Sequence, residues 1–183
     1  MKTPDIDHTK YSLLLVETAQ VTDFLYQIYT LSPLCQWGYL YKGTPLDHLK
    51  EHGPIWIEVE QDSPILQHQQ KDLHWRANSS LVSSLQVDRT KLMAHLKGLV
   101  TIHTTSGEHW LFRYHHPSVL MKINQILTAQ ERSNFTAEIM SIHYEHYDHS
   151  ERIWRASNIT ATETPKTSNT LSLSPNSMEH LLA

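Results

Sequence analysis

The chain has 183 residues, a net charge of −4 with histidine neutral, and 39% hydrophobic, 19% charged and 9% aromatic residues. This length suits one domain with a tail, and it can bury a core without disulfide bonds. Because the charge is mildly negative and no run of Lys or Arg occurs, we expect neither nucleic acid nor a membrane surface as partner. The single cysteine, Cys35, excludes a disulfide framework within one chain.

The N-terminal sequence MKTPDIDHTK is polar and has no signal-peptide core. No stretch of the sequence approaches the roughly 20 apolar residues of a membrane span. We therefore expect a cytoplasmic protein.

The first half of the chain predicts strands that alternate with helices. Apolar runs and two-residue alternation predict strands at 11–17, 37–41, 54–60 and 80–85. Helical spacing with capping residues predicts helices at 21–32 (capped by Thr22), 43–53, 63–75 and 88–99. Gly43, Gly53 and Gly107 stand at element boundaries, where we expect a positive φ angle.

The second half predicts hairpins and further helices. Residues 100–115 are expected to form a hairpin that turns at Ser106 and Gly107, and a helix is expected from Pro117 to about 127. Thr128 and Glu131 fit a capping box for another helix, and 139–157 read as a second hairpin.

These elements predict an α/β (α+β) fold, in which a mixed β-sheet packs against helices and the hairpins come late. We expect one domain over residues 1–157. Residues 158–183 are rich in Ser, Thr and Asn and predict a disordered tail, whose final MEHLLA either docks as a short helix or stays frayed.

Histidine is unusually abundant, with 14 residues spread along the chain. His115 and His116 are adjacent, so on a strand they point to opposite faces and do not chelate one ion together. His48 and His52 have helical spacing, but no third ligand is indicated. The residues His143, His146 and His149 lie three apart, which does not place them on one side of a strand. We expect no metal site and no cofactor.

Nucleophilic and nucleotide chemistry lack their usual sequence patterns. No reactive motif surrounds Cys35, which we expect to be a buried small hydrophobe. The chain has no G-x-S-x-G elbow, and its five glycines never cluster into a phosphate loop. We expect no catalytic residues and a protein that is not an enzyme.

Aromatic side chains fall mostly in predicted strands. Trp37, Tyr39 and Tyr41 share one strand face, and either the core or a binding surface can use them. Farther along, Trp110 is expected to share a strand face with Phe112 and Tyr114, while Arg113 lies on the opposite face.

Four segments occur in a specific order: YSLLLVETAQ, GTPLDHLKEHGPIWIEVE, LFRYHHPSVL and LTAQERSNF. This order, over about residues 10–150, resembles the adaptor or chaperone domain of bacterial type VI secretion systems, the Tap/TEC family. The resemblance implies a non-enzymatic cytoplasmic loader that binds a cognate effector toxin, through the toxin's N-terminal region, and helps to place it on the VgrG spike protein.

The family pattern has an acidic residue before the proline of the third segment, where this chain has His116. Arg113 is therefore expected to lack its carboxylate partner at that place. We expect Arg113 either to tie down the corner between strand and helix or to contact a carboxylate of the partner. The candidate partner-binding residues are Arg113, Tyr114, His116, Trp110, Tyr39 and Tyr41.

Two other functions fit parts of the sequence. A toxin-binding immunity protein would have the same size and charge, although the order of motifs does not favour it. A His-dependent metalloenzyme would use the abundant histidines.

Overall fold

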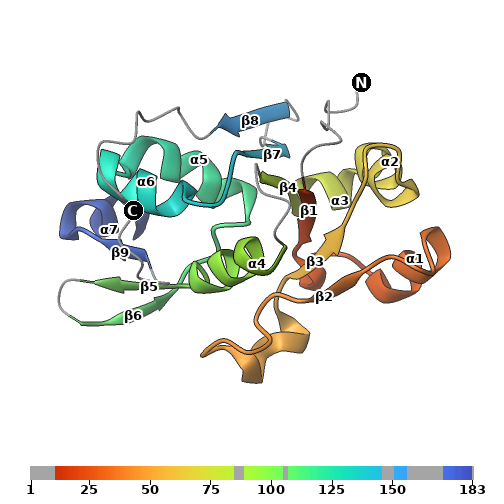
Figure 1. Ribbon diagram of the computed structural model, residues 1–183, viewed down its shortest axis with the longest axis horizontal. Helices are drawn as coiled ribbons and strands as arrows, with labels where there is room; N and C mark the ends of the chain where they lie inside the picture. The colour runs from red at the N-terminus through yellow and green to blue at the C-terminus, as the bar shows by residue number, and fades with distance from the viewer. Residues whose placement is uncertain (1–10, 85–88, 105–106, 146–150, 156–170, 183) are drawn as a thin grey trace.

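The computed structural model describes residues 11–84, 89–104, 107–145, 151–155 and 171–182 (Figure 1). In these parts of the chain a six-stranded sheet has the order β2-β3-β1-β4-β7-β8, and all neighbouring strands are antiparallel. Its strands are β1 (Tyr11–Val16), β2 (Trp37–Tyr39), β3 (Ile55–Glu58), β4 (Ser79–Ser84), β7 (Ser141–Glu145) and β8 (Glu151–Arg155). The α/β (α+β) class expected from the sequence is confirmed.

The central strand β1 is buried on both faces of the sheet. Leu14 and Val16 belong to one hydrophobic core, and Leu13 and Leu15 belong to a second core on the opposite face. Because both faces are covered, the strand reads as a continuous apolar run rather than an alternation.

Three helices cover the first face, on the right in Figure 1. They are α1 (Phe24–Leu31), α2 (Pro64–Lys71) and α3 (Leu73–Ala77). Phe24 of α1 stacks on Trp75 of α3, with ring centroids 4.9 Å apart. This aromatic contact joins two helices that lie far apart in sequence and anchors α1 over the sheet.

The second face is covered by the remaining helices and by a small sheet, on the left in Figure 1. The helices are α4 (Arg89–Gly98), α5 (Pro117–Ile126), α6 (Ala129–Thr136) and α7 (Pro175–Leu182). The small sheet has the order β6-β5-β9, from β5 (Thr101–Thr104), β6 (His109–Leu111) and β9 (Leu171–Leu173). It is a mixed sheet, because β5 pairs antiparallel with β6 and parallel with β9.

Several predicted helix boundaries are confirmed by their caps. The capping box of Thr128 and Glu131 is present at the start of α6, and Ser63 accepts a hydrogen bond from the Leu66 N–H at the start of α2. His116 precedes α5 and accepts from the Ser118 N–H through Nδ1, at 3.3 Å.

Other helices differ from the prediction for local reasons. The helix expected at 63–75 is interrupted at Asp72, whose carboxylate instead accepts from the His74 and Trp75 N–H groups and starts α3. The helix expected to follow Thr22 begins only at Phe24, after a left-handed Asp23 with φ of 49°. The segment expected as a helix at 43–53 forms a 3-10 helix, η2 (Asp47–His52).

Residues 171–182 correct one part of the expectation of a disordered tail over 158–183. Within that segment, Leu171 and Leu173 of β9 and Met178 of α7 are buried in the second core. The prediction failed for this part because two leucines separated by one serine are enough for a short strand that adds to an existing sheet. The docked-helix alternative for MEHLLA is the one that the structure has, and residues 156–170 lie outside the described parts.

The glycines follow the prediction at two of three positions. Gly43 and Gly107 have φ angles of 74° and 85°. Gly53 has an ordinary φ of −98°, so the expectation of a positive φ is wrong there. A Cβ at this position would overlap the ring of Tyr41, which shows that close packing requires this glycine.

Candidate partner-binding site

Three side chains meet where β1 ends, and we call Glu17, Arg113 and His115 the Glu17 corner. Arg113 donates from Nη2 to Oε2 of Glu17 at 2.9 Å, and Nε2 of His115 lies 3.2 Å from the same oxygen. Glu17 directly follows β1, whereas the other two residues belong to the segment between β6 and α5. The corner therefore ties the central strand to the start of α5.

Burial and charge set the protonation of this corner. Burial acts to raise the pKa of Glu17, but the hydrogen bond from His115 and the charge of Arg113 outweigh it, so the pKa is lowered. Burial lowers the pKa of His115 despite the neighbouring carboxylate. At neutral pH the corner thus holds a carboxylate, a guanidinium and a neutral imidazole. Burial and the Glu17 charge also raise the pKa of the nearby Tyr41 to about 12.

The expectation that Arg113 lacks a carboxylate partner is wrong, because Glu17 supplies one from 96 residues away. No local pattern links the two positions, so sequence reasoning missed Glu17. The place where the family pattern has an acidic residue is a helix cap, and the imidazole of His116 fills that role. The role of tying down the corner is the one the geometry supports for Arg113, whose side chain is still 45% exposed.

The structure does not bring the six predicted site residues to one surface. Tyr114 is fully buried and donates its hydroxyl to the Leu96 carbonyl at 3.0 Å, and Tyr41 lies in the same core. Trp110 lies on β6 and is 41% exposed. Because β6 ends at Leu111, the buried Tyr114 lies outside the strand that carries Trp110. Tyr39 is half-buried on β2, against the core under α1.

Metal and thiol chemistry find little support in the described parts of the chain. Among these residues no group of three or more His, Cys, Asp or Glu is placed to hold a metal ion. Cys35 is half-buried against the core under α1, and burial raises the pKa of its thiol. A raised pKa disfavours the reactive thiolate. Within the same parts, no helix is long and apolar enough to cross a membrane.

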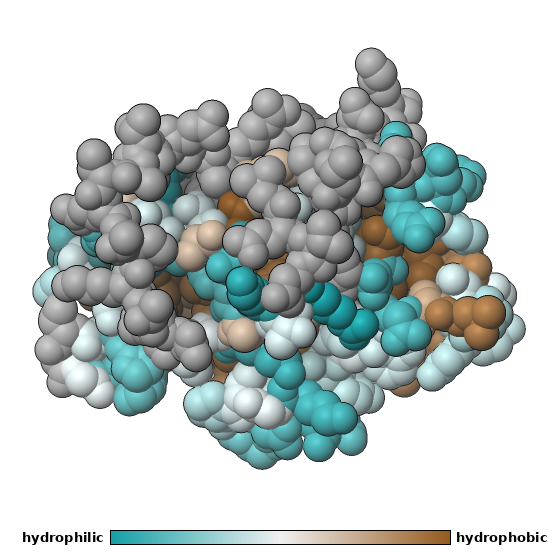
Figure 2. Space-filling view, viewed as in Figure 1, coloured by the Kyte–Doolittle hydropathy of each residue, from teal (hydrophilic) through white to brown (hydrophobic). Residues whose placement is uncertain are grey.

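A surface that the sequence did not single out lies on α1. Leu25, Tyr26 and Tyr29 are 41%, 75% and 53% exposed, although large apolar and aromatic side chains are usually covered. Figure 2 shows hydrophobic residues gathered on this side of the molecule, at the right of the view. The signal was present in the sequence FLYQIYTL, because apolar and aromatic residues surround the whole helix while one face suffices to pack on the sheet.

The exposed residues of α1 continue into the edge strand β2. The ring centroid of Trp37 lies 6.3 Å from that of Tyr29 and 5.7 Å from that of Tyr39, both in edge-to-face contact. We call Leu25, Tyr26, Tyr29, Trp37 and Tyr39 the α1–β2 face. Within it, Tyr29, Trp37 and Tyr39 form a row of aromatic rings beside the edge strand of the large sheet.

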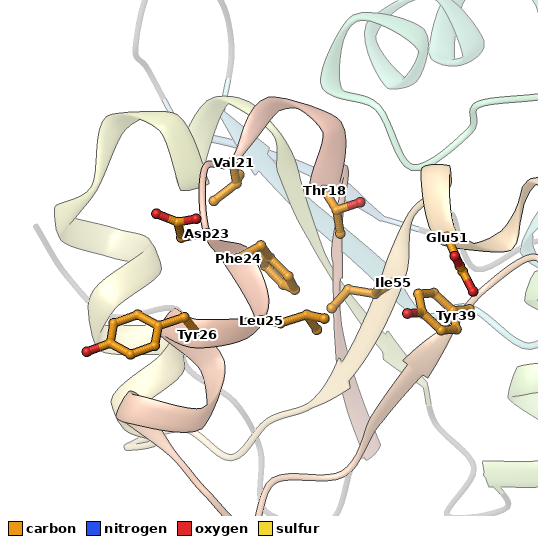
Figure 3. Close-up of a pocket in the computed structure, with 9 residues that line it drawn as sticks. All are labelled: Thr18, Val21, Asp23, Phe24, Leu25, Tyr26, Tyr39, Glu51 and Ile55. Atoms are coloured by element: carbon orange, nitrogen blue, oxygen red, sulfur yellow. The ribbon is translucent and has the colours of Figure 1, made fainter.

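A groove of about 390 Å³ opens beside this face. Its lining comes from the segment between β1 and α1, from α1, from β2 and β3, and from η2: Thr18, Val21, Asp23, Phe24, Leu25, Tyr26, Tyr39, Glu51 and Ile55. In Figure 3 apolar side chains occupy the middle of this group, and the carboxylates of Asp23 and Glu51 lie at opposite sides. An apolar floor with charged margins is the usual make-up of a protein-binding site.

Comparison with protein families gives one match, to the family described as Domain of unknown function (DUF4123), over residues 13–134. The chain belongs to this family. The matched segment runs from β1 into α6 and includes the Glu17 corner, the α1–β2 face and the groove. The family is known for adaptors or chaperones of type VI secretion effectors, which agrees with the resemblance seen in the sequence. Comparison with curated proteins and comparison with solved structures both gave no match.

Proposed function

We propose that this DUF4123 protein is a non-enzymatic adaptor of a type VI secretion system. It binds a cognate effector toxin in the cytoplasm, through the N-terminal region of the toxin, and loads it onto the VgrG spike. The observation that carries the proposal is the family match over residues 13–134, in a family known for effector adaptors.

The surface of the molecule supports a binding role. The α1–β2 face exposes Tyr26 and Tyr29 beside the half-buried Trp37, and tyrosine and tryptophan anchor protein interfaces more often than other residues. A rigid two-sided core holds this face in place, so a partner meets a preformed surface.

Co-expression tests the proposal directly. The protein is produced together with the toxin encoded beside its gene, with and without the VgrG encoded there, and each mixture is separated by size exclusion with light scattering. We expect a stable complex, and toxin that is insoluble alone becomes soluble in it. Absence of any complex with toxin, with spike or with both would refute the adaptor function.

A second readout separates an adaptor from an immunity protein. Cells that express the toxin in its target compartment are challenged with and without this chain. An adaptor leaves the toxin active, whereas protection of the cells would identify an immunity protein. Metal at a whole-number ratio in the purified protein, retained against a chelator, would instead favour a metalloenzyme.

A further inference from the structure

The outer edge of β2 is open in the described parts of the chain, because β2 is the first strand of the six-stranded sheet. Its inner edge bonds to β3: the Gln36 carbonyl accepts from the Glu58 N–H, and the Leu40 N–H donates to the Pro54 carbonyl. In an antiparallel pair alternate residues direct their backbone groups to the same side. The backbone groups of Trp37 and the N–H of Tyr39 therefore point to the open edge.

Apart from its short length, this edge has few of the features that normally prevent strand addition. Sheet edges are commonly protected by lysine, proline or a bulge, and the three residues of β2, Trp-Gly-Tyr, contain none of them. Beside the edge runs the aromatic row of Tyr29, Trp37 and Tyr39. A strand added here would place every second side chain on that row, since side chains of neighbouring strands share the faces of a sheet.

Charge indicates what the added segment carries. The groove at the Tyr39 end of β2 is lined by two exposed acidic residues, Asp23 and Glu51, and by no lysine or arginine. Within the described parts of the chain, neither carboxylate makes a hydrogen bond or an ion pair. Both are thus available to a cation, and the complementary partner is basic at this point.

We propose that an extended segment of a partner protein adds to the open edge of β2 as a further strand, lays alternate apolar side chains on the α1–β2 face, and places a lysine or arginine in the groove between Asp23 and Glu51. That the partner is the effector toxin rests on the proposed function. The strand addition itself rests on the edge geometry, the aromatic row and the groove charge.

Two pairs of variants test the backbone and the charge contributions. Trp37→Pro and Trp37→Thr both remove the indole ring, but only the proline removes the outward N–H, and edge strands tolerate proline on that side. Loss of one backbone hydrogen bond makes binding about fivefold weaker for Trp37→Pro than for Trp37→Thr. The double variant Asp23→Asn/Glu51→Lys reverses the net charge of the groove and keeps at position 23 a residue that tolerates the left-handed backbone. We expect it to weaken binding by about tenfold or more.

The matched control is Leu111→Ala, which removes a large apolar side chain that is 48% exposed, on the edge strand β6 of the other sheet. Binding should be unchanged in this variant. Circular dichroism and thermal unfolding verify that each variant is folded. If a Trp37 variant does not fold, the charge reversal still tests the proposal, because it changes only exposed side chains.

The probe is a random peptide library displayed on phage and selected on the full-length protein, followed by fluorescence polarisation with the selected peptides. We expect peptides with alternating apolar residues and a Lys or Arg, and the losses of affinity given above. Failure to select any peptide, selection of acidic peptides, or peptides whose affinity falls in Leu111→Ala but not in the Trp37 and groove variants would overturn the proposal.

The same variants in the toxin co-expression separate this inference from the function. A toxin complex that forms equally well with Trp37→Pro and with the charge reversal would leave the adaptor function standing and overturn the docking mode. Peptides that bind as expected without any toxin or spike complex would support the docking mode and refute the adaptor function.

Discussion

Arg113 reaches across the fold to Glu17, donating from Nη2 to Oε2 at 2.9 Å. The pair is unequal, because the Glu17 side chain is only 6% exposed while that of Arg113 is 45% exposed. The carboxylate has left water almost completely, and it relies on Arg113 and His115 for its hydrogen bonds. The arginine keeps contact with solvent.

Arg113→Ala should lower the free energy of unfolding by about 1–2 kcal/mol. This is below the cost of breaking a fully buried pair, about 3–5 kcal/mol, because almost half of the Arg113 side chain is exposed. In the Glu17→Gln background the same change should cost less, because no buried charge is left without a partner. Urea unfolding of the four proteins gives the coupling energy. Independent, additive effects would contradict the structural role of the pair.

The Glu17 corner also predicts loss of stability in acid. Burial lowers the pKa of His115 below its ordinary value of 6.5, so the unfolded chain takes up this proton first. The stability contributed by the neutral imidazole is present above pH 6.5 and is lost as pH falls toward the lowered pKa. Glu17, whose pKa is also lowered, adds a second loss below about pH 4.5.

The variant His115→Gln keeps an N–H donor for Glu17 but cannot titrate. Its stability should therefore depend less on pH between about 7 and 5 than that of the wild type. The variant still shows part of the acid loss, since burial also lowers the pKa of His95. Chemical unfolding at a series of pH values measures both slopes, and identical slopes would show that His115 does not contribute.

The sequence predicted most elements because their signals are local. The capping box at Thr128, the proline after His116 and the apolar run of β1 each act within a few residues, and each is found where expected. The exact helix starts were harder, since a side chain such as Asp72 has two backbone partners to choose from and tertiary packing decides between them.

The candidate site depended on contacts that no local pattern records. The partner of Arg113 is distant in sequence. Tyr41 and Tyr114 are of a residue type that is common at protein interfaces, but both side chains lie in the core. Which of the many aromatic residues stay exposed follows only from how α1 packs on the sheet. Of the aromatic candidates, the structure exposes Trp110, half-buries Tyr39 and buries Tyr41 and Tyr114.

Gly53→Ala should destabilise the protein by about 1–3 kcal/mol, because the new Cβ overlaps the buried ring of Tyr41 and forces it from its position. The backbone there has an ordinary φ of −98°, so alanine itself is compatible with the conformation. In a Tyr41→Leu background the cost of Gly53→Ala should largely disappear. An equal cost in both backgrounds, measured by thermal unfolding, would mean that the ring is not the cause.

Glu131 joins the end of the chain to α6. Its carboxylate accepts from the Thr128 N–H at 2.8 Å, from the Ser177 hydroxyl at 2.8 Å and from the Ser174 N–H. Burial acts to raise the pKa of Glu131, but these hydrogen bonds outweigh it and lower the pKa. The Glu131 carboxylate is charged although the residue is only 6% exposed. Its hydrogen bonds therefore should hold β9 and α7 to the rest of the domain.

Glu131→Ala should cost about 2–4 kcal/mol, because it removes the capping box and leaves the N–H of Ser174 without its acceptor. Glu179→Ala is the control, since that residue is exposed on α7 and its loss should change stability by less than about 0.5 kcal/mol. Limited proteolysis should then remove the C-terminal segment faster from Glu131→Ala than from the control. Equal cleavage rates and equal unfolding midpoints would show that apolar contacts of Leu171, Leu173 and Met178 alone hold the segment in place.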